Sequence, residues 1–140
     1  MQIEIFDPAP DINLADIRQG VEQVINGEQK TSEYINIIFM GRDELRLVKK
    51  EYFGLDLYTD VIAFNLNDPD QAIAGELYLS YDQIIQNSHE FKTKAENEVI
   101  RVVIHGCLHL CGYEDDTNEL KTKMTELENR YLKIIEELSS

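Results

Sequence analysis

The spacing of hydrophobic and polar residues changes several times along the chain, and each change marks the start or end of an expected element. Alternation or a short apolar run predicts a strand, whereas apolar residues three and four apart predict an amphipathic helix. Over the first 80 residues these patterns predict the order β-α-β-α-β-β. The expected elements are a strand at 2–6, a helix from Leu14 to Gly27, a strand at 34–40, a helix at about 42–51, and strands at 61–66 and 75–80.

From residue 81 onward the pattern is helical. Three helices are expected, over about 81–92, 95–111 and 117–138. The last helix repeats apolar residues in one stripe that should pack on the rest of the protein. The stripe contains Leu120, Met124, Leu127, Tyr131, Ile134 and Leu138. The sequence therefore predicts an α+β fold, in which about five helices cover a small mixed four-stranded β-sheet.

Length and composition favour one compact domain spanning residues 1–140. With 43% hydrophobic and 29% charged residues, the chain lies in the ordinary globular range. No apolar stretch approaches the roughly 18 residues that a membrane span needs. The two cysteines, Cys107 and Cys111, lie in one helical segment, where their spacing does not favour disulfide geometry. We therefore expect a cytoplasmic protein with reduced thiols and no membrane contact.

The net charge of −14 repels polyanions at long range, so the overall composition gives no support to nucleic-acid binding. Any RNA contact must rest on a local patch. Arg42, Arg46 and Lys49 are spaced to form one basic stripe along the helix expected at about 42–51, and they are candidate RNA-binding residues. The alternative interpretation of this stripe is an ordinary solvated helix face.

The strongest chemical signal lies at residues 102–111, which are apolar on nearly every side and predict a helix buried in the middle of the domain. His105 and His109 interrupt this helix. Residues four apart project from the same helix face with about 6 Å between their Cβ atoms, so both imidazoles can bind one cation. We therefore expect a metal site on this central helix. Gly106 stands where zincin proteases carry a general-base glutamate, so a standard zincin protease is disfavoured.

A third metal ligand is expected shortly after this helix. Gly112 is well placed to end the helix in the left-handed conformation and to turn the chain back toward the histidine face. Glu114, Asp115 and Asp116 can then return to that face. Asp116 with Glu119 is typical of an N-cap pair for the last helix. Asp115 is the freer carboxylate, and we expect it to complete the site for one divalent ion.

The segment HGCLHLCGYEDD at 105–116 resembles the signature H-G-x-L-H-L-x-G-Y-D-H of the YbeY family. The segments TDVIAF at 59–64 and GELYLS at 75–80 are similar to two further family segments in the same order. This family consists of bacterial metal-dependent endoribonucleases that take part in ribosomal RNA maturation and ribosome quality control. The resemblance covers nearly the whole chain and implies a mixed sheet with helices around a zinc site.

Two positions depart from the pattern of the family that the chain resembles. Asp115 stands where the family commonly has a third histidine ligand, and two histidines with one carboxylate also form an open zinc site. Phe53 stands where the family commonly has an arginine linked to activity. Without that guanidinium, a scissile phosphate needs another cationic partner, such as Arg42 or Arg46.

The resemblance implies hydrolysis of an RNA phosphodiester at one Zn²⁺ bound by His105, His109 and Asp115, with the fourth position left to water. Glu114 or Asp116 is a candidate proton shuttle. The implied partner is ribosomal RNA or the small ribosomal subunit. One alternative, which the missing arginine favours, is a non-catalytic ribosome-assembly factor with a structural metal. Another is a metal-dependent hydrolase of a different substrate, such as a peptide.

Overall fold

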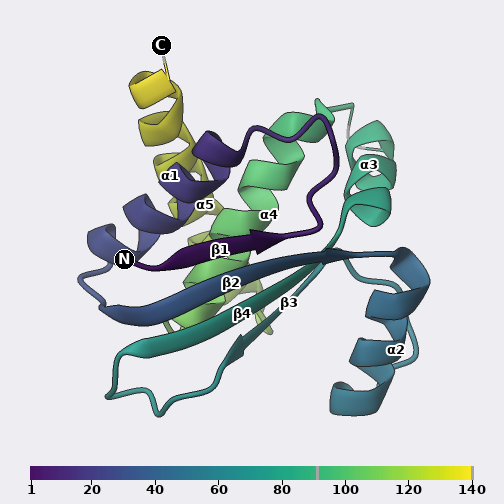
Figure 1. Ribbon diagram of the computed structural model, residues 1–140, viewed down its shortest axis with the longest axis horizontal. Coiled ribbons are helices and arrows are strands. Elements are labelled where there is room, and N and C mark those ends of the chain that lie inside the picture. Colours follow the sequence, from purple (N-terminus) through teal and green to yellow (C-terminus); the bar gives the residue numbers. More distant parts are fainter. Residues whose placement is uncertain (91, 140) are drawn as a thin grey trace.

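The computed structural model describes residues 1–90 and 92–139, and within these ranges it contains four strands and five helices (Figure 1). The elements are β1 (Ile3–Phe6), α1 (Leu14–Gly27), β2 (Ser32–Met40), α2 (Arg42–Phe53), β3 (Val61–Asn65), β4 (Ile73–Ser80), α3 (Tyr81–Glu90), α4 (Ala95–Leu110) and α5 (Asn118–Ser139). The order expected from the sequence is confirmed. The helix expected at 81–92 ends at Glu90, and residue 91 lies outside the described part of the chain.

The strands form one mixed sheet in the order β1-β2-β4-β3. β1, β2 and β4 run parallel to one another, whereas β3 runs antiparallel to β4 and forms one edge of the sheet. In β2, buried side chains alternate with half-exposed ones, as in a strand that packs on the core through one face only. The predicted α+β class with a four-stranded mixed sheet is therefore confirmed.

Helices α1, α4 and α5 lie together on one side of the sheet, and α2 stands at one end of it (Figure 1). α4 occupies the middle of this layer and contacts α1, α3, α5, β3 and β4. The apolar side chains of α4 are buried around most of its circumference, as expected for a central helix. They are Val99, Val102, Val103, Ile104, Cys107, Leu108 and Leu110.

The apolar stripe of α5 packs only through the middle turns of the helix. Its buried apolar side chains are Met124, Leu127, Tyr131 and Ile135. Leu120 and Leu138, at the two ends of the expected stripe, are 37% and 54% exposed, and Ile134 is only half-buried. Ile134 still packs against the core, as predicted. The prediction was wrong at Leu120 and Leu138, because α5 has 22 residues whereas α1 and α4, on which it packs, have 14 and 16.

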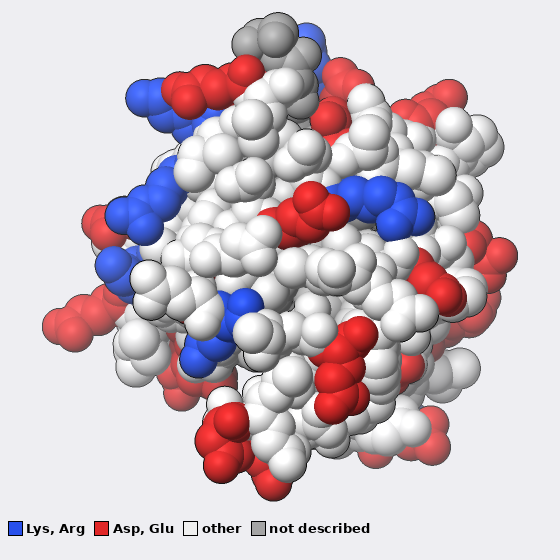
Figure 2. Space-filling model, turned by 60° about the vertical axis from the view of Figure 1, so that its left-hand side comes forward, with Lys and Arg blue, Asp and Glu red and all other residues white. Residues whose placement is uncertain are grey.

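Acidic residues outnumber basic ones by 27 to 13, and the surface reflects this excess. On the face that Figure 2 shows, Lys and Arg side chains are interspersed with Asp, Glu and uncharged side chains, without a continuous basic band. Binding of a polyanion would therefore depend on local contacts rather than on the overall charge.

No helix in the described ranges is long and apolar enough to cross a membrane.

α4 approaches the sheet closely at Gly106. A Cβ atom at this position would lie 2.8 Å from Leu77 Cδ2 and 3.3 Å from Val61 Cγ2. Leu77 is fully buried, so its side chain has no free space into which it can move. The missing side chain at Gly106 therefore sets the distance between α4 and the sheet.

We predict opposite effects of glycine-to-alanine changes in two helices. Gly106→Ala should lower the free energy of unfolding by about 1 kcal/mol, because the cost of overpacking exceeds the gain in helix propensity. Gly20→Ala in α1 should raise it by about 0.5 to 1 kcal/mol, since a Cβ there meets Ile135 at an ordinary contact distance of 3.6 Å. Urea denaturation of both variants measures the difference, and stabilisation by both changes would contradict the close packing.

Candidate metal centre

His105 and His109 project from the same face of α4, as their spacing predicted. The centroids of their rings are 4.6 Å apart, and the two Nε2 atoms lie 3.0 Å from each other. Both side chains are about one-quarter exposed, so they sit at the boundary between the core and solvent. The helix therefore presents two imidazole nitrogens to one small volume that solvent can reach.

The end of α4 brings an acidic side chain to the same volume. Gly112 has a φ of 104°, a conformation that side chains with a Cβ rarely adopt, and its N–H donates to the His109 carbonyl. The N–H of Tyr113 donates to the Leu108 carbonyl, which completes a Schellman motif and reverses the chain. Asp115 Oδ2 then lies 3.3 Å from Nε2 of His105 and 3.5 Å from Nε2 of His109. These three side chains form a group that could hold a metal ion.

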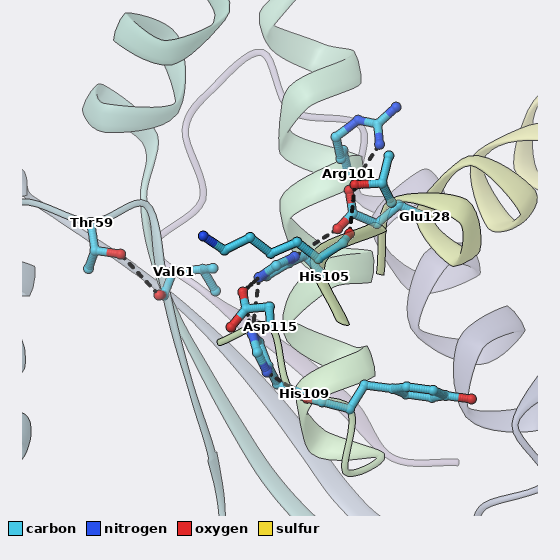
Figure 3. A network of polar contacts seen from close by, with 10 residues as sticks. Thr59, Val61, Arg101, His105, His109, Asp115 and Glu128 are labelled. Atoms are coloured by element: carbon cyan, nitrogen blue, oxygen red, sulfur yellow. Dashed lines mark hydrogen bonds and ion pairs between the residues drawn. The ribbon is translucent and has the colours of Figure 1, made fainter. Parts of the chain in front are cut away.

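The other nitrogen of each imidazole is already engaged (Figure 3). Nδ1 of His109 lies 2.8 Å from the carbonyl oxygen of Tyr113, which can only accept, so this nitrogen must carry the proton. Nδ1 of His105 lies 2.7 Å from Oε2 of Glu128, a carboxylate oxygen on α5. Glu128 is buried, and its Oε1 accepts a hydrogen bond of 2.9 Å from Arg101. In the neutral form of both rings, each Nε2 therefore directs a lone pair toward the other.

This arrangement favours a proton or a metal ion between the three groups. Two Nε2 lone pairs and the carboxylate of Asp115 are three acceptors that face one another without a donor, which is unfavourable unless a proton or metal ion lies between them. Burial by itself lowers the pKa of His105. The hydrogen bond and charge of Glu128, with the charges of Asp115 and Asp60, outweigh burial and leave the pKa of His105 raised. The same negative environment favours a metal ion.

The three side chains line a cleft of about 520 Å³ between α2, β3 and α4. Its further lining residues are Lys49, Phe53, Thr59, Asp60, Val61, Ile62, Ala63 and Glu114. Asp60 directly precedes β3. Burial raises the pKa of its carboxyl group, and the Asn87 side chain donates a hydrogen bond of 3.4 Å to it. The cleft thus combines the candidate ligands with one ammonium group and two further carboxylates.

The two candidate proton shuttles, Glu114 and Asp116, differ in their position relative to the cleft. Glu114 lines the cleft, but Asp116 is exposed and is not part of the lining. The prediction that Asp116 caps α5 was wrong. Thr117 takes this role, because its Oγ1 accepts a hydrogen bond of 3.1 Å from the backbone N–H of Leu120.

The basic stripe on α2 also divides. Lys49 lines the cleft, with its Nζ 4.8 Å from the centroid of the Phe53 ring. Arg42 and Arg46 instead lie over the ring of Tyr58, at 4.2 and 4.7 Å, and Arg46 forms an ion pair of 2.7 Å with Asp56. Of the three stripe residues, only Lys49 therefore has direct access to the candidate metal centre.

Sequence reasoning missed Glu128 and Asp60 as site residues. Glu128 adjoins the buried Leu127, in a stripe that otherwise predicts packing, and a buried acid needs a partner. Asp60 directly precedes an apolar strand, where a carboxylate is partly desolvated. In both cases an acidic residue beside core positions indicated a partly buried carboxylate. The sequence pattern did not indicate that this carboxylate would lie near His105.

The cysteines lie apart from this chemistry, as the helical geometry predicted. Cys107 is buried and Cys111 is half-buried, and both are free thiols. Burial raises the pKa of the Cys107 thiol and brings the pKa of Cys111 to about 12. Neither is therefore poised as a thiolate ligand at neutral pH.

Comparison with known proteins gives a consistent result. Residues 2–136 match the sequence model of a family described as Endoribonuclease YbeY. Endoribonuclease YbeY of Chloroherpeton thalassium is 41% identical over 116 residues, which are 83% of this chain and 82% of that protein. The Chlorobaculum tepidum protein of that name is 34% identical over 94% of this chain and 96% of its own. A solution structure of TM1509 from Thermotoga maritima has a TM-score of 0.69 and 28% identity, covering 96% of this chain and 89% of that one.

The contacts of Glu128 generate a prediction about metal affinity. Glu128→Gln should raise the dissociation constant of the metal about tenfold to a hundredfold, because the carboxylate that orients His105 and strengthens its Nε2 as a donor is lost. The fraction of His105 in the Nδ1–H tautomer should fall as well. Competition with a chelating dye and ¹⁵N NMR of the imidazole measure the two effects. Glu126→Gln, an exposed change on the same helix, is the control. Unchanged affinity and tautomer in Glu128→Gln would show that the contact does not orient the ligand.

Proposed function

The chain belongs to the YbeY endoribonuclease family, and from this membership and the geometry of its cleft we propose that it cleaves phosphodiester bonds in ribosomal RNA with one zinc ion per chain. The observation that carries the proposal is the convergence of His105, His109 and Asp115 in a cleft open to solvent. The relatives do not favour a purely structural metal or a peptide substrate, since they carry the name of a ribonuclease.

The donor set supports zinc as the ion. Two imidazoles and one carboxylate with an open position are typical of catalytic zinc sites. Ligand atoms about 2.0 to 2.1 Å from a tetrahedral ion lie roughly 3.3 Å from one another. The three separations here are 3.0, 3.3 and 3.5 Å, so the side chains need little rearrangement to bind zinc.

The protein side chains divide the remaining tasks. Zinc, when bound, lowers the pKa of a water molecule toward neutrality and polarises a phosphate oxygen. Glu114 is the proposed proton shuttle, because it lines the cleft beside Asp115, whereas Asp116 is a weaker candidate outside the lining. Asp60 offers a second carboxylate, and its raised pKa brings it closer to the range in which a group exchanges protons at neutral pH.

Lys49 is the proposed cationic partner of the scissile phosphate. It lines the cleft and lies one helical turn before Phe53, the position at which the sequence pattern lacks the expected arginine. An ammonium group binds phosphate as a point charge, although it lacks the two-pronged geometry of a guanidinium. Arg42 and Arg46 would contact RNA farther along α2, after leaving their positions over Tyr58.

The small ribosomal subunit is the proposed setting of the reaction. A chain with 27 acidic and 13 basic residues repels bulk RNA, so recognition would combine the cleft with a defined ribosomal substrate. Such a substrate would place the protein in the cytoplasm. The free thiols of Cys107 and Cys111 agree with a reducing compartment.

The metal assignment predicts about one equivalent of zinc per chain. His105→Ala or His109→Ala should remove most of it, because two ligands remain where three are needed. Asp115→Asn should weaken binding more than Asp116→Asn, since an amide replaces an anionic ligand only at the first position. Asp115→His should keep the metal. Elemental analysis after gel filtration measures the content, and full zinc in the double histidine variant would place the site elsewhere.

The catalytic assignment predicts metal-dependent cleavage of structured ribosomal RNA. The zinc-loaded protein should cut it, and both chelation and His109→Ala should abolish cutting, whereas Cys111→Ser should leave it intact. Readdition of zinc should restore activity to the chelated protein but not to the histidine variant. Gel analysis of end-labelled RNA shows the products. Cutting that survives chelation would reject this mechanism.

A further inference from the structure

Aromatic side chains gather at the end of α2 that adjoins the cleft. The ring of Phe53 stacks on Phe64 of β3, with centroids 5.8 Å apart and an interplanar angle of 18°. Tyr52 meets Phe64 edge-on at 5.5 Å. Tyr52 and Phe53 are nevertheless 67% and 47% exposed, so the contacts hold the rings in place without covering them. Large rings held this way at a surface are a feature of binding sites rather than of a core.

The position of Phe53 connects this cluster to the proposed catalytic cleft. Phe53 lines the cleft together with His105, His109 and Asp115. Its partner Phe64 belongs to β3, the edge strand, so the aromatic surface continues around the edge of the sheet from the metal ligands. A polymer whose phosphate lies at the metal ligands would therefore place an adjoining nucleotide beside Phe53.

The contact between Lys49 and Phe53 indicates how such a nucleotide would bind. An ammonium over an exposed ring contributes about 0.5 to 1 kcal/mol, whereas a nucleobase stacked on an aromatic side chain contributes about 1 to 3 kcal/mol. A base would therefore displace Nζ of Lys49, now 4.8 Å from the ring centroid. The displaced ammonium remains within reach of the phosphate attached to the same nucleotide. The base would then stack on Phe53 while Lys49 pairs with the phosphate.

We propose that Phe53, supported by Phe64 and Tyr52, is a stacking site for an unpaired nucleobase next to the scissile phosphate. The inference rests on the proposed ribonuclease function and deepens it, because it names a residue that would position the substrate beside the metal ligands. A paired base is already stacked within its helix and cannot offer its face to Phe53, so only an unpaired base can occupy this site.

An RNA base is a better occupant than an apolar protein segment for two reasons. The exposed rings adjoin the proposed metal ligands and Lys49, which are groups that bind a phosphate. They also adjoin Asp60 and Glu114, which an apolar segment would have to desolvate without compensation. A single nucleotide offers both a flat apolar base and a charged phosphate, so it can contact the ring and the cationic groups at the same time.

The sequence contains no tryptophan, which permits a direct optical test. Phe53→Trp introduces a single indole at the proposed site, and Leu47→Trp introduces one at a 65% exposed position on the same helix that is not part of the cleft lining. With the zinc-loaded protein and a short oligoadenylate, fluorescence of Phe53→Trp should be quenched by stacking. An oligomer of the same length with abasic sugars should quench little, and Leu47→Trp should respond to neither.

Affinity measurements on variants without an introduced tryptophan provide the second arm. Phe53→Leu, which keeps an apolar contact with Phe64, should weaken binding of labelled single-stranded RNA by on the order of tenfold, and Phe53→Tyr should restore it. The salt dependence of binding should be the same in Phe53→Leu and the wild type. Lys49→Ala should lower its slope by about 0.7, because one phosphate contact is lost.

The outcomes separate this inference from the proposed function. Loss of base-dependent quenching, or equal affinity of Phe53→Leu and the wild type in a protein that still cleaves RNA, would overturn the stacking site and leave the ribonuclease function standing. Wild-type protein that neither binds nor cleaves RNA would overturn both. Quenching by an apolar peptide but not by oligoadenylate would identify a protein-docking surface and would also reject the proposal.

Discussion

The close contact between α4 and the sheet at Gly106 determines what the rest of the site can be. Because a Cβ there would meet the buried Leu77 at 2.8 Å, α4 lies directly on the strands, and its side chains are apolar around most of the circumference. Between Val102 and Leu110 the two strongly polar side chains are His105 and His109, and both line the cleft. The same contact explains why this helix cannot carry the glutamate of a zincin. The position after His105 faces the sheet, so the proton-transfer group of the proposed mechanism would come from outside this helix, such as Asp60 or Glu114.

The candidate metal centre is also tied to the packing of the other helices. Glu128 on α5 holds Nδ1 of His105, and Arg101 on α4 holds Glu128 in turn. Tyr113, directly after the turn at Gly112, and Tyr131 on α5 both donate hydrogen bonds to Glu28, next to the end of α1. The loop that contains Asp115 is therefore anchored between α1 and α5. Because the ligands depend on docked helices, metal binding and the correct packing of α1 and α5 should stabilise each other.

The extent to which the sequence predicted this site follows from distance along the chain. His105, His109 and Asp115 lie within one segment, where the helical period and the left-handed Gly112 fix their relative positions. Strand and helix order followed from local periodicity for the same reason. Glu128 and Asp60 belong to parts of the chain far from the histidines in sequence, and local patterns do not encode how those parts dock. The division of the basic stripe on α2 depends on such docking as well. The capping error was different in kind, because Asp116 and Thr117 both suit an N-cap and only the observed start of α5 selects between them.

A strongly acidic ribonuclease must obtain affinity for RNA without a continuous basic surface. At a net charge of −14, each additional phosphate contact works against long-range repulsion, and salt weakens such contacts further. Base stacking does not share this penalty, because it depends on the area and polarisability of neutral rings. The proposed stacking on Phe53 would therefore supply binding energy that does not depend on charge, with Lys49 supplying the charge beside it. Zinc would supply the remaining positive charge at the reacting phosphate, so the protein itself needs few basic residues near the cleft.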